Sequence, residues 1–259
     1  MSDINYDSIG SALVTIGGFH KPVKKIYETV GGVWNLYYSA KPSYDATFAN
    51  NDWATIIFAC QNNEVPSTWV VGNQKLISIG GTDYLIDIIG KSHDAYSDGS
   101  GTAPLTFQLH DCYVTSYAMS SSGTNSSGWT SSDMRATHLP AILALMPSEV
   151  QAAIKEVNKV TSKGNKSTTL ETTADKLFLL SEQEVFGSIE YSCSGEGDQY
   201  SYYSTSSNRI KSKGGSTAYW WERSPRKSNA YHYCVVGSDG IANIGTSNVS
   251  YGVAPAFCF

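Results

Sequence analysis

Apolar positions occur in short runs along this chain, and glycine pairs or polar segments separate most of them. Residues 75–79 and 84–89 are rich in β-branched and apolar side chains and flank Gly80-Gly81, which is the pattern of a β-hairpin. Other apolar runs are of similar length, and strands need only about four to eight residues. Further strands are therefore expected at residues 69–72, 104–109 and 176–180.

Two helices are predicted from their capping residues. Asp52 precedes the apolar segment 53–60 and is expected to cap a helix there, because its carboxylate can accept from the first free N–H groups. Ser181 and Glu184 have the spacing of a capping box. They predict a short helix that ends at Gly187.

Two further helices are predicted from apolar positions spaced by three or four residues. The first covers 132–143, where Pro140 is expected to kink or split it, and the second covers 148–160. Residues 115–132 and 191–217 are polar and are expected to be loops. The whole pattern predicts an α+β domain with short antiparallel strands, two to four helices and long polar loops.

The first 40 residues form a separate region in this pattern. Short β-branched and aromatic runs beside Gly17-Gly18 and Gly31-Gly32 predict tight hairpins. A module of this size buries too little apolar surface to be stable alone, so we expect residues 1–40 to dock on a partner or to oligomerise. Residues 41–51 are predicted to be a linker, and residues 52–259 one large domain.

Composition narrows the functional class. Charged residues make up only 16% of the chain, and Ser, Thr, Asn, Gly and 17 tyrosines take their place. Such a composition favours a loop-rich protein of an extracellular or particle surface. The net charge of −5 argues against a nucleic-acid partner, and no apolar run approaches the roughly 18 residues that cross a bilayer. The acidic start lacks a signal region, so we expect cytoplasmic synthesis and release by lysis or assembly.

Residue patterns that carry metal, redox or cofactor chemistry are sparse. The five cysteines are widely spaced, so we expect no disulfide and five small buried side chains. The pairs His93-Asp94 and His110-Asp111 are adjacent in sequence, and neighbours on a strand point to opposite faces, so neither pair forms a site by itself. Without a metal-binding spacing or a nucleotide fingerprint, we predict no catalytic residue, no metal and no cofactor.

Carboxylates could still meet in space for glycoside hydrolysis, because such a pair needs no fixed spacing in sequence. The alternative is that the carboxylates of this region are solvated loop residues without a joint role. The nearest candidates are Glu182, Glu184, Glu196 and Asp198.

The last forty residues carry the most specific pattern. They contain the segments Tyr219-Trp220-Trp221-Glu222-Arg223-Ser224-Pro225, Val236-Gly237-Ser238-Asp239-Gly240 and Tyr251-Gly252-Val253-Ala254-Pro255-Ala256-Phe257-Cys258-Phe259. This order of aromatic strand, turn and final strand resembles the C-terminal core of C-type-lectin-like domains, in the form common in phage and prophage proteins of gut bacteria. An apolar ending is otherwise unexplained, so we expect Val253, Phe257 and Phe259 to be buried.

A second resemblance lies near the N-terminus. The segment from His20 to Trp34, which ends in Val30-Gly31-Gly32-Val33-Trp34, is similar to a segment of many phage tail and minor structural proteins of Firmicutes. Together the resemblances imply a phage tail-associated virion protein that is made in the bacterial host cytoplasm. Its N-terminal module would bind other tail proteins, and the chain would form a homo-oligomer, with a trimer favoured.

Three other interpretations remain open. The chain could be a non-binding decoration or spacer protein of the particle, or a host-encoded adhesin, which would need a secretion signal. Formylglycine-generating enzymes share the broad fold, but Cys234 and Cys258 lack the short spacing of their reactive pair, and Ala254 stands where they have arginine. The calcium-binding triplets of sugar-binding C-type lectins are absent from the sequence, although Asp94, Asp98 and Asp239 lie in predicted loops and could supply oxygens.

The resemblance implies recognition, with a bacterial surface glycan or protein bound by loops between the terminal strands. Tyr, Trp and Arg are the residue types that dominate such contacts, and Ser, Gly and Asn add adaptable hydrogen bonds. Two alternatives weigh against individual residues: Trp220 and one of its neighbours could be core residues, and Arg223 could tie its strand to the core. The predicted contact residues are Tyr202, Tyr203, Trp221, Arg223, Arg226, Asn229, Tyr231 and His232.

Overall fold

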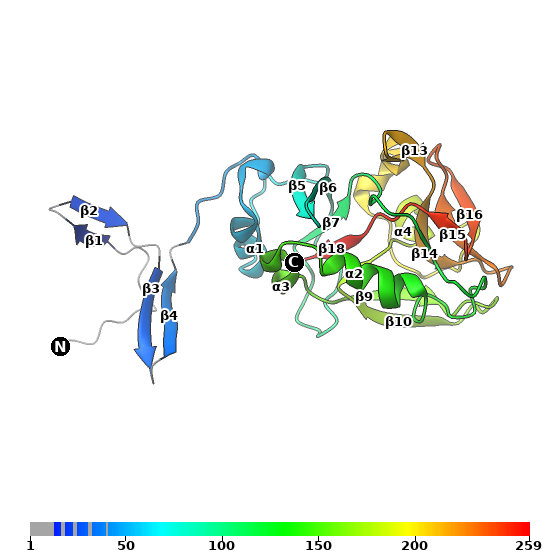
Figure 1. Cartoon of the computed structure of the whole chain (residues 1–259), viewed down its shortest axis with the longest axis horizontal. Helices are drawn as coiled ribbons and strands as arrows, with labels where there is room; N and C mark the ends of the chain where they lie inside the picture. Colours follow the sequence, from blue (N-terminus) through cyan, green and yellow to red (C-terminus); the bar gives the residue numbers. More distant parts are fainter. Residues whose placement is uncertain (1–12, 17–18, 23–24, 31–32, 40) are drawn as a thin grey trace. The chain divides into compact units, whose positions relative to one another are not determined.

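The structure is a computed structural model of the 259-residue chain. It describes residues 13–16, 19–22, 25–30, 33–39 and 41–259. The chain divides into two compact units, Met1–Tyr44 and Asp45–Phe259 (Figure 1). Among the described residues, no helix is long and apolar enough to cross a membrane.

The described part of the first unit consists of two antiparallel strand pairs. β1 (Leu13–Ile16) pairs with β2 (Phe19–Pro22), and β3 (Lys25–Val30) pairs with β4 (Val33–Ser39). The predicted hairpin pairing is therefore confirmed. The glycine pairs predicted to form the turns, at 17–18 and 31–32, lie outside the described residues.

The predicted linker 41–51 is wrong from Asp45 onward, because this segment belongs to the second unit. Phe48, in the 3-10 helix η2 (Phe48–Asn50), is buried. Its ring centre lies 5.4 Å from that of Trp69 and 6.0 Å from that of Phe107. The Trp69 indole N–H donates to the main-chain oxygen of Asp45 at 2.9 Å. One aromatic side chain thus anchors a polar segment to the core.

The central sheet of the second unit has five antiparallel strands in the order β11–β18–β7–β6–β5. All side chains of β7 are buried, as expected for a strand covered on both faces. Val253, Phe257 and Phe259 are buried, which confirms the prediction for the last apolar segment. The strands are β5 (Gln74–Ile79), β6 (Thr82–Lys91), β7 (Leu105–Leu109), β11 (Leu177–Phe178) and β18 (Ala256–Cys258).

A second sheet carries the aromatic segment near the end of the chain. It consists of β14 (Trp220–Pro225), β15 (His232–Val236) and β16 (Ala242–Thr246), and every side chain of β14 is buried. Short antiparallel pairs complete the unit, so the predicted mixture of helices and short antiparallel strands is confirmed. These pairs are β9 (Val157–Ser162) with β10 (Leu170–Asp175), β12 (Lys211–Lys213) with β13 (Ser216–Ala218), and β8 (Tyr117–Ala118) with β17 (Ser250–Tyr251).

The two helices predicted from capping residues are present. α1 (Trp53–Gln61) begins after Asp52, whose carboxylate accepts from the Thr55 N–H at 2.7 Å. α4 (Glu182–Phe186) has the predicted capping box of Ser181 and Glu184. It ends at Gly187, whose φ of 70° lies in the left-handed region that glycine adopts without strain.

The helix predicted at 132–143 is split in two, as expected from Pro140. A π-helical segment, η3 (Met134–His138), leads into α2 (Leu139–Leu143). Pro140 stands in the first turn of α2, where a missing N–H breaks no helical hydrogen bond. Figure 1 shows these helices on one side of the unit, in green.

The helix predicted at 148–160 is too long. α3 (Ser148–Ala153) is short, and β9 follows it from Val157. Val157, Lys159 and Thr161 are buried at alternate positions, which is the two-residue period of a strand. The prediction failed because the partner strand β10 was not recognised.

Two other local predictions differ from the structure. Residues 69–72 contain no strand, and residues 71–72 form a turn, so the strand predicted there is wrong. The predicted polar loop 191–217 holds η4 (Ser201–Ser204), η5 (Ser206–Arg209) and the β12–β13 pair. Tyr200 and Tyr203 of this segment are completely buried, so much of it belongs to the core.

Candidate functional site

Four of the eight predicted contact residues are core residues. Tyr203, Trp221 and Arg223 are completely buried, and Tyr202 is only 8% exposed. Trp221 donates its indole N–H to the Tyr117 oxygen at 2.8 Å, inside the unit. The prediction that these four side chains belong to a binding face is therefore wrong, because β14 is buried along its whole length and η4 buries both of its tyrosines.

Arg223 ties β14 to the core, which is the alternative role expected for it. Its guanidinium donates to both oxygens of the Glu184 carboxylate, at 2.5 and 3.1 Å. Every guanidinium nitrogen has a partner inside the protein, which leaves none for a ligand. The other acceptors are Thr161 Oγ1 at 2.9 Å and the main-chain oxygens of Leu179 at 3.0 Å, Val160 at 3.0 Å and Glu196 at 2.6 Å.

Lys159 lies beside this pair and is also buried. Its ammonium donates to Asp94, to Glu184 at 3.2 Å and to the Tyr200 hydroxyl at 2.9 Å. Burial alone would raise the pKa of Asp94, but the Lys159 ammonium and several hydrogen bonds outweigh it and hold this pKa well below its usual range. Two acids and two bases therefore balance one another in the core, where breaking either pair would leave a buried charge.

The carboxylates considered for glycoside hydrolysis are mostly buried. Only Asp198 is exposed, so the alternative of solvated loop carboxylates is wrong for Glu182, Glu184 and Glu196. Glu184 binds Arg223, and Glu196 accepts from the Ser162 N–H at 2.9 Å and from the Ser224 hydroxyl. Glu182 accepts from the N–H groups of residues 190–192 at 2.7 to 3.1 Å. Protein donors engage all three, so none is available as an acid–base partner.

The other four predicted residues lie close together, three on the loop between β14 and β15 and His232 at the start of β15. The Asn125 amide donates to the main-chain oxygens of Asn229 and His232 at 2.8 and 2.7 Å. The Asn229 side-chain oxygen in turn accepts from the His232 ring at 2.9 Å and from the Tyr231 N–H at 2.7 Å. Tyr231 is 57% exposed, and Arg226, Asn229 and His232 are half-buried. This loop is therefore fixed in shape and accessible from outside.

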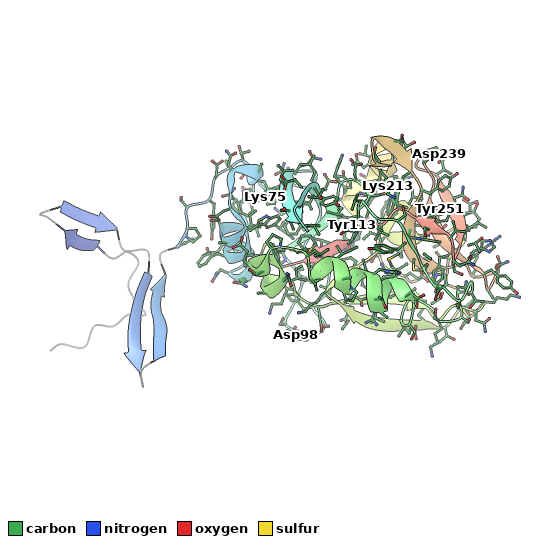
Figure 2. The ribbon with its side chains drawn as sticks, viewed as in Figure 1. Lys75, Asp98, Tyr113, Lys213, Asp239 and Tyr251 are labelled. Atoms are coloured by element: carbon green, nitrogen blue, oxygen red, sulfur yellow. The ribbon has the colours of Figure 1, made fainter. Side chains whose placement is uncertain are left out.

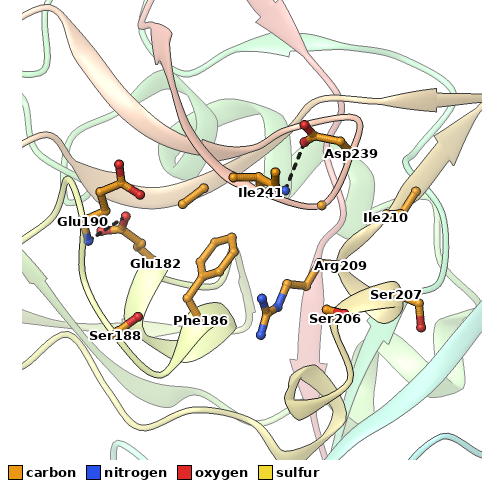
Figure 3. A pocket seen from close by; sticks show the side chains of 12 residues that line it. Glu182, Phe186, Ser188, Glu190, Ser206, Ser207, Arg209, Ile210, Asp239 and Ile241 are labelled. Atoms are coloured by element: carbon orange, nitrogen blue, oxygen red, sulfur yellow. Dashed lines mark hydrogen bonds between the residues drawn. The ribbon is translucent and has the colours of Figure 1, made fainter.

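A cavity of about 540 Å³ opens between α4, η5 and the turn that joins β15 to β16. Phe186 enters it from α4 and Arg209 from η5, and the guanidinium carbon of Arg209 lies 4.8 Å from the centre of the Phe186 ring. Figure 3 shows Glu190 and Asp239 on the side opposite these two residues. The lining also includes Ser188, Ser206, Ser207, Ile210 and Ile241.

Arg209 brings an unpaired positive charge to the cavity. One of its terminal N–H groups donates to the main-chain oxygen of Tyr203 at 3.0 Å, while its buried Nε has no partner within the described part of the chain. The ion pairs found among the described residues do not include Arg209. Arginine stays protonated at physiological pH. With Glu190 and Asp239 exposed opposite it, the cavity has a positive wall and a negative wall.

Buried contacts hold these walls in place. The Trp220 indole N–H donates to the main-chain oxygen of Arg209 at 2.9 Å, which fixes the end of η5. Glu182 fixes the loop that contains Tyr191. The Tyr191 ring lies 5.7 Å from the guanidinium of Arg226, so the cavity wall adjoins the fixed loop 226–232.

Sequence reasoning did not identify Phe186 or Arg209 as site residues. Phe186 was part of a correctly predicted helix, and Arg209 lay in a segment taken to be a loop. A usable signal was present, because Arg209 is the single arginine of the serine-rich stretch 191–217. Asp239 was considered only as a possible calcium ligand. Within the described residues, no group of three or more His, Cys, Asp or Glu side chains is arranged to hold a metal ion.

His110 pairs with a residue that is distant in sequence. Its Nδ1 lies 2.9 Å from the Asp87 carboxylate on β6, and the Gln74 amide donates to the same carboxylate at 2.8 Å. The hydrogen bond to Asp87 raises the pKa of His110. The adjacent Asp111 instead accepts from the Ser212 N–H at 2.7 Å. The expectation that His110 and Asp111 do not form a unit thus agrees with their contacts.

Comparison with known proteins gives a family but no named relative. None of the curated proteins and none of the solved structures compared with this chain matches it. Residues 106–259 match a family model, and this range covers more than half of the chain and the whole lining of the cavity. The chain therefore belongs to the family described as a domain of unknown function, DUF6273.

Proposed function

We propose that the protein is a phage tail-associated component of the virion that binds the bacterial surface without catalysis. Two resemblances support this role: the ending of the chain and the segment from His20 to Trp34 are similar to those of phage and prophage proteins. In this proposal the Asp45–Phe259 unit is a C-type-lectin-like recognition domain. The first unit binds other tail proteins, and the chain forms a homo-oligomer, with a trimer favoured.

The cavity beside α4 is the observation that carries the binding role. Its volume falls within the range of about 300–1,000 Å³ that is usual for small-ligand sites. Arg209 supplies a positive wall, Glu190 and Asp239 a negative wall, and Phe186 an apolar surface. Complementary charge requires a ligand that has a carboxylate and an amine as well as apolar surface.

Fragments of the bacterial cell wall have this chemistry. A muropeptide joins hydroxyl-rich sugar rings to a short peptide with free carboxylate and amino groups. In the proposed complex a carboxylate binds Arg209 and an amine lies between Glu190 and Asp239. The serine hydroxyls of the lining are placed to hydrogen-bond the remaining polar groups.

Calorimetric titration with purified muropeptides tests this proposal. Arg209→Gln and Glu190→Gln should each raise the Kd by about tenfold or more, because each removes one charge from a complementary pair. Lys163→Gln and Glu149→Gln are matched controls, since both residues are exposed and lie outside the cavity lining. The control variants should bind like the unaltered protein.

A second arm tests the adjoining loop. The Arg226→Ala and Tyr231→Ala double variant should weaken adsorption to host cells while its melting temperature stays nearly unchanged, because Tyr231 is exposed and Arg226 half-buried. Equal Kd values for Arg209→Gln and the unaltered protein would reject the cavity as the binding site. An unaltered protein that binds neither muropeptides nor host cells would favour the non-binding spacer.

A further inference from the structure

Four aromatic rings on the second unit, outside the cavity, form a row of two contacting pairs, which the β8–β17 pairing brings together. The rings of His138 and Tyr117 are stacked, with centres 4.1 Å apart and planes at 17°. Tyr117 and Tyr251 are directly opposite each other in the β8–β17 pair, so their side chains project from the same face. The Tyr251 ring, labelled in Figure 2, lies 5.7 Å from that of Tyr219. The row therefore runs His138, Tyr117, Tyr251, Tyr219.

The row is accessible from outside the protein. Tyr219 is 39% exposed, and the other three residues are half-buried. A buried tyrosine usually directs its hydroxyl to a protein partner. In the described part of the chain, the hydroxyls of these three tyrosines have no hydrogen-bond partner. They are therefore available to a ligand.

Trp221 supports the row from beneath. Its ring meets the Tyr251 ring edge to face, with centres 5.0 Å apart, and its indole N–H holds the main-chain oxygen of Tyr117 at 2.8 Å. Gly245 makes this packing feasible, because a Cβ there would lie 2.5 Å from the Tyr251 ring and 2.9 Å from the Trp221 ring. The rings are thus held in place before any ligand arrives, which lowers the entropy cost of binding.

The row itself is neutral. Burial lowers the pKa of His138, so its imidazole is uncharged at neutral pH despite the nearby Asp133. The Asp133 carboxylate accepts from the Ser121 N–H at 2.7 Å. The ammonium of Lys213 donates at 2.6 Å to the hydroxyl of Ser116, the residue before Tyr117. The charges next to the row therefore already have protein partners.

We propose that this row is a second binding site and that its ligand is the chain of a neutral polysaccharide. A pyranose ring has C–H groups on its faces and hydroxyls on its edge, which matches a tyrosine with an apolar ring and a free hydroxyl. Rings placed in succession contact successive sugars of one chain. A charged ligand gains nothing from a neutral row, and single-stranded nucleic acid requires a basic groove as well as stacking rings.

Affinity electrophoresis through gels that contain a β-glucan, a mannan or a galactan tests the site. At least one of these neutral polysaccharides should retard the full-length protein. The Tyr219→Ala and Tyr251→Ala double variant should raise the Kd by about tenfold or more. Tyr219→Ala alone is a second variant that preserves folding, since its ring contacts the row only at Tyr251 among the described ring pairs. Leu76→Ala removes an exposed apolar side chain outside the row and should bind normally.

The outcomes separate this site from the cavity. Arg209→Gln should lose muropeptide binding and keep polysaccharide binding, whereas the row variants should show the reverse. The proposal is overturned if none of the neutral polysaccharides retards the protein. It is also overturned if folded row variants bind a neutral polysaccharide as tightly as the unaltered chain. A third contrary outcome is that the unaltered chain binds an oligonucleotide and the Tyr219→Ala variant does not.

Discussion

Arg223 and Glu184 form a two-point contact in the interior, with one guanidinium nitrogen on each carboxylate oxygen. Both side chains are almost completely buried. Only the planar fork of arginine matches the two oxygens in this way, and the same fork reaches Thr161 on β9 through its Nε. The contact therefore joins α4, β9 and β14 at one point.

Lysine cannot replace this arginine. The Arg223→Lys variant retains the charge but loses the second hydrogen bond to Glu184 and several bonds to main-chain oxygens. We expect the free energy of unfolding to fall by about 1.5–3 kcal/mol, the usual worth of a hydrogen bond to a charged group. Urea denaturation measures it, with Arg226→Lys at a half-buried position as the control. A loss as small as that of the control would contradict a structural role for Arg223.

Glu196 should make the protein less stable as the pH rises from about 4.5 to about 7. Burial raises the pKa of this carboxyl from its ordinary 4.5 to about 7, so the folded chain keeps a proton that the unfolded chain has lost. Stability from this group is therefore complete below pH 4.5 and is lost as the pH approaches 7. At 1.36 kcal/mol per pKa unit, the loss is about 3 kcal/mol.

The Glu196→Gln variant isolates this effect, because glutamine has the same shape and does not ionise. Its free energy of unfolding, measured by urea denaturation from pH 4.5 to 7.5, should decline less than that of the unaltered protein. Comparison of the two curves cancels the opposite contributions of carboxylates such as Asp94, whose pKa is lowered. Parallel curves would show that Glu196 does not titrate in this range.

Removal of residues 253–259 should prevent folding. This segment contains β18, which pairs with β11 on one side and with β7 on the other. The Phe107 ring lies 5.3 Å from that of Phe257 and 5.4 Å from that of Phe259. Each buried phenylalanine contributes ~1.5–3 kcal/mol, against a total stability of about 5–15 kcal/mol. Thermal melting is the measurement, and Phe259→Leu, which keeps most of the apolar volume, should still melt cooperatively. A chain without residues 253–259 that still melts cooperatively would refute the prediction.

The cysteines should be unreactive in the folded protein. All five are buried and free, and burial raises the pKa of Cys60 to about 12 and that of Cys112 to about 11. Because the thiolate is the reactive form, a thiol reagent should label none of them under native conditions and all five in guanidinium chloride. Two fewer thiols after denaturation would reveal a disulfide.

The sequence was sufficient where one or two residues decide the outcome. Asp52, the Ser181 and Glu184 pair and Pro140 each act within a single helical turn, so no distant contact was needed to place them. The strand at 157–162 was missed because contacts between residues distant in sequence decide its structure. Lys159 is favourable in that strand only through partners such as Asp94, which lies far away in sequence.

The candidate site was harder to predict because burial in β14 follows no simple alternation. Neighbouring residues such as Trp220 and Trp221 point to opposite faces of a strand, so in a sheet covered on one face one of them would be exposed. Packing on both faces buries them both. The cavity residues Phe186, Arg209 and Asp239 come from three separate segments, and only the packed fold brings them together.

Glu182 and Asn125 hold two outer loops through main-chain groups. Because nearly all amino acids share these main-chain groups, the hydrogen bonds that hold the loops do not depend on which side chains the loops carry. Residues such as Glu190, Tyr191 and Tyr231 can therefore be exchanged by mutation while each loop keeps its course. The architecture is thus tolerant to variation at its exterior, and the surface can change in evolution while the scaffold stays the same.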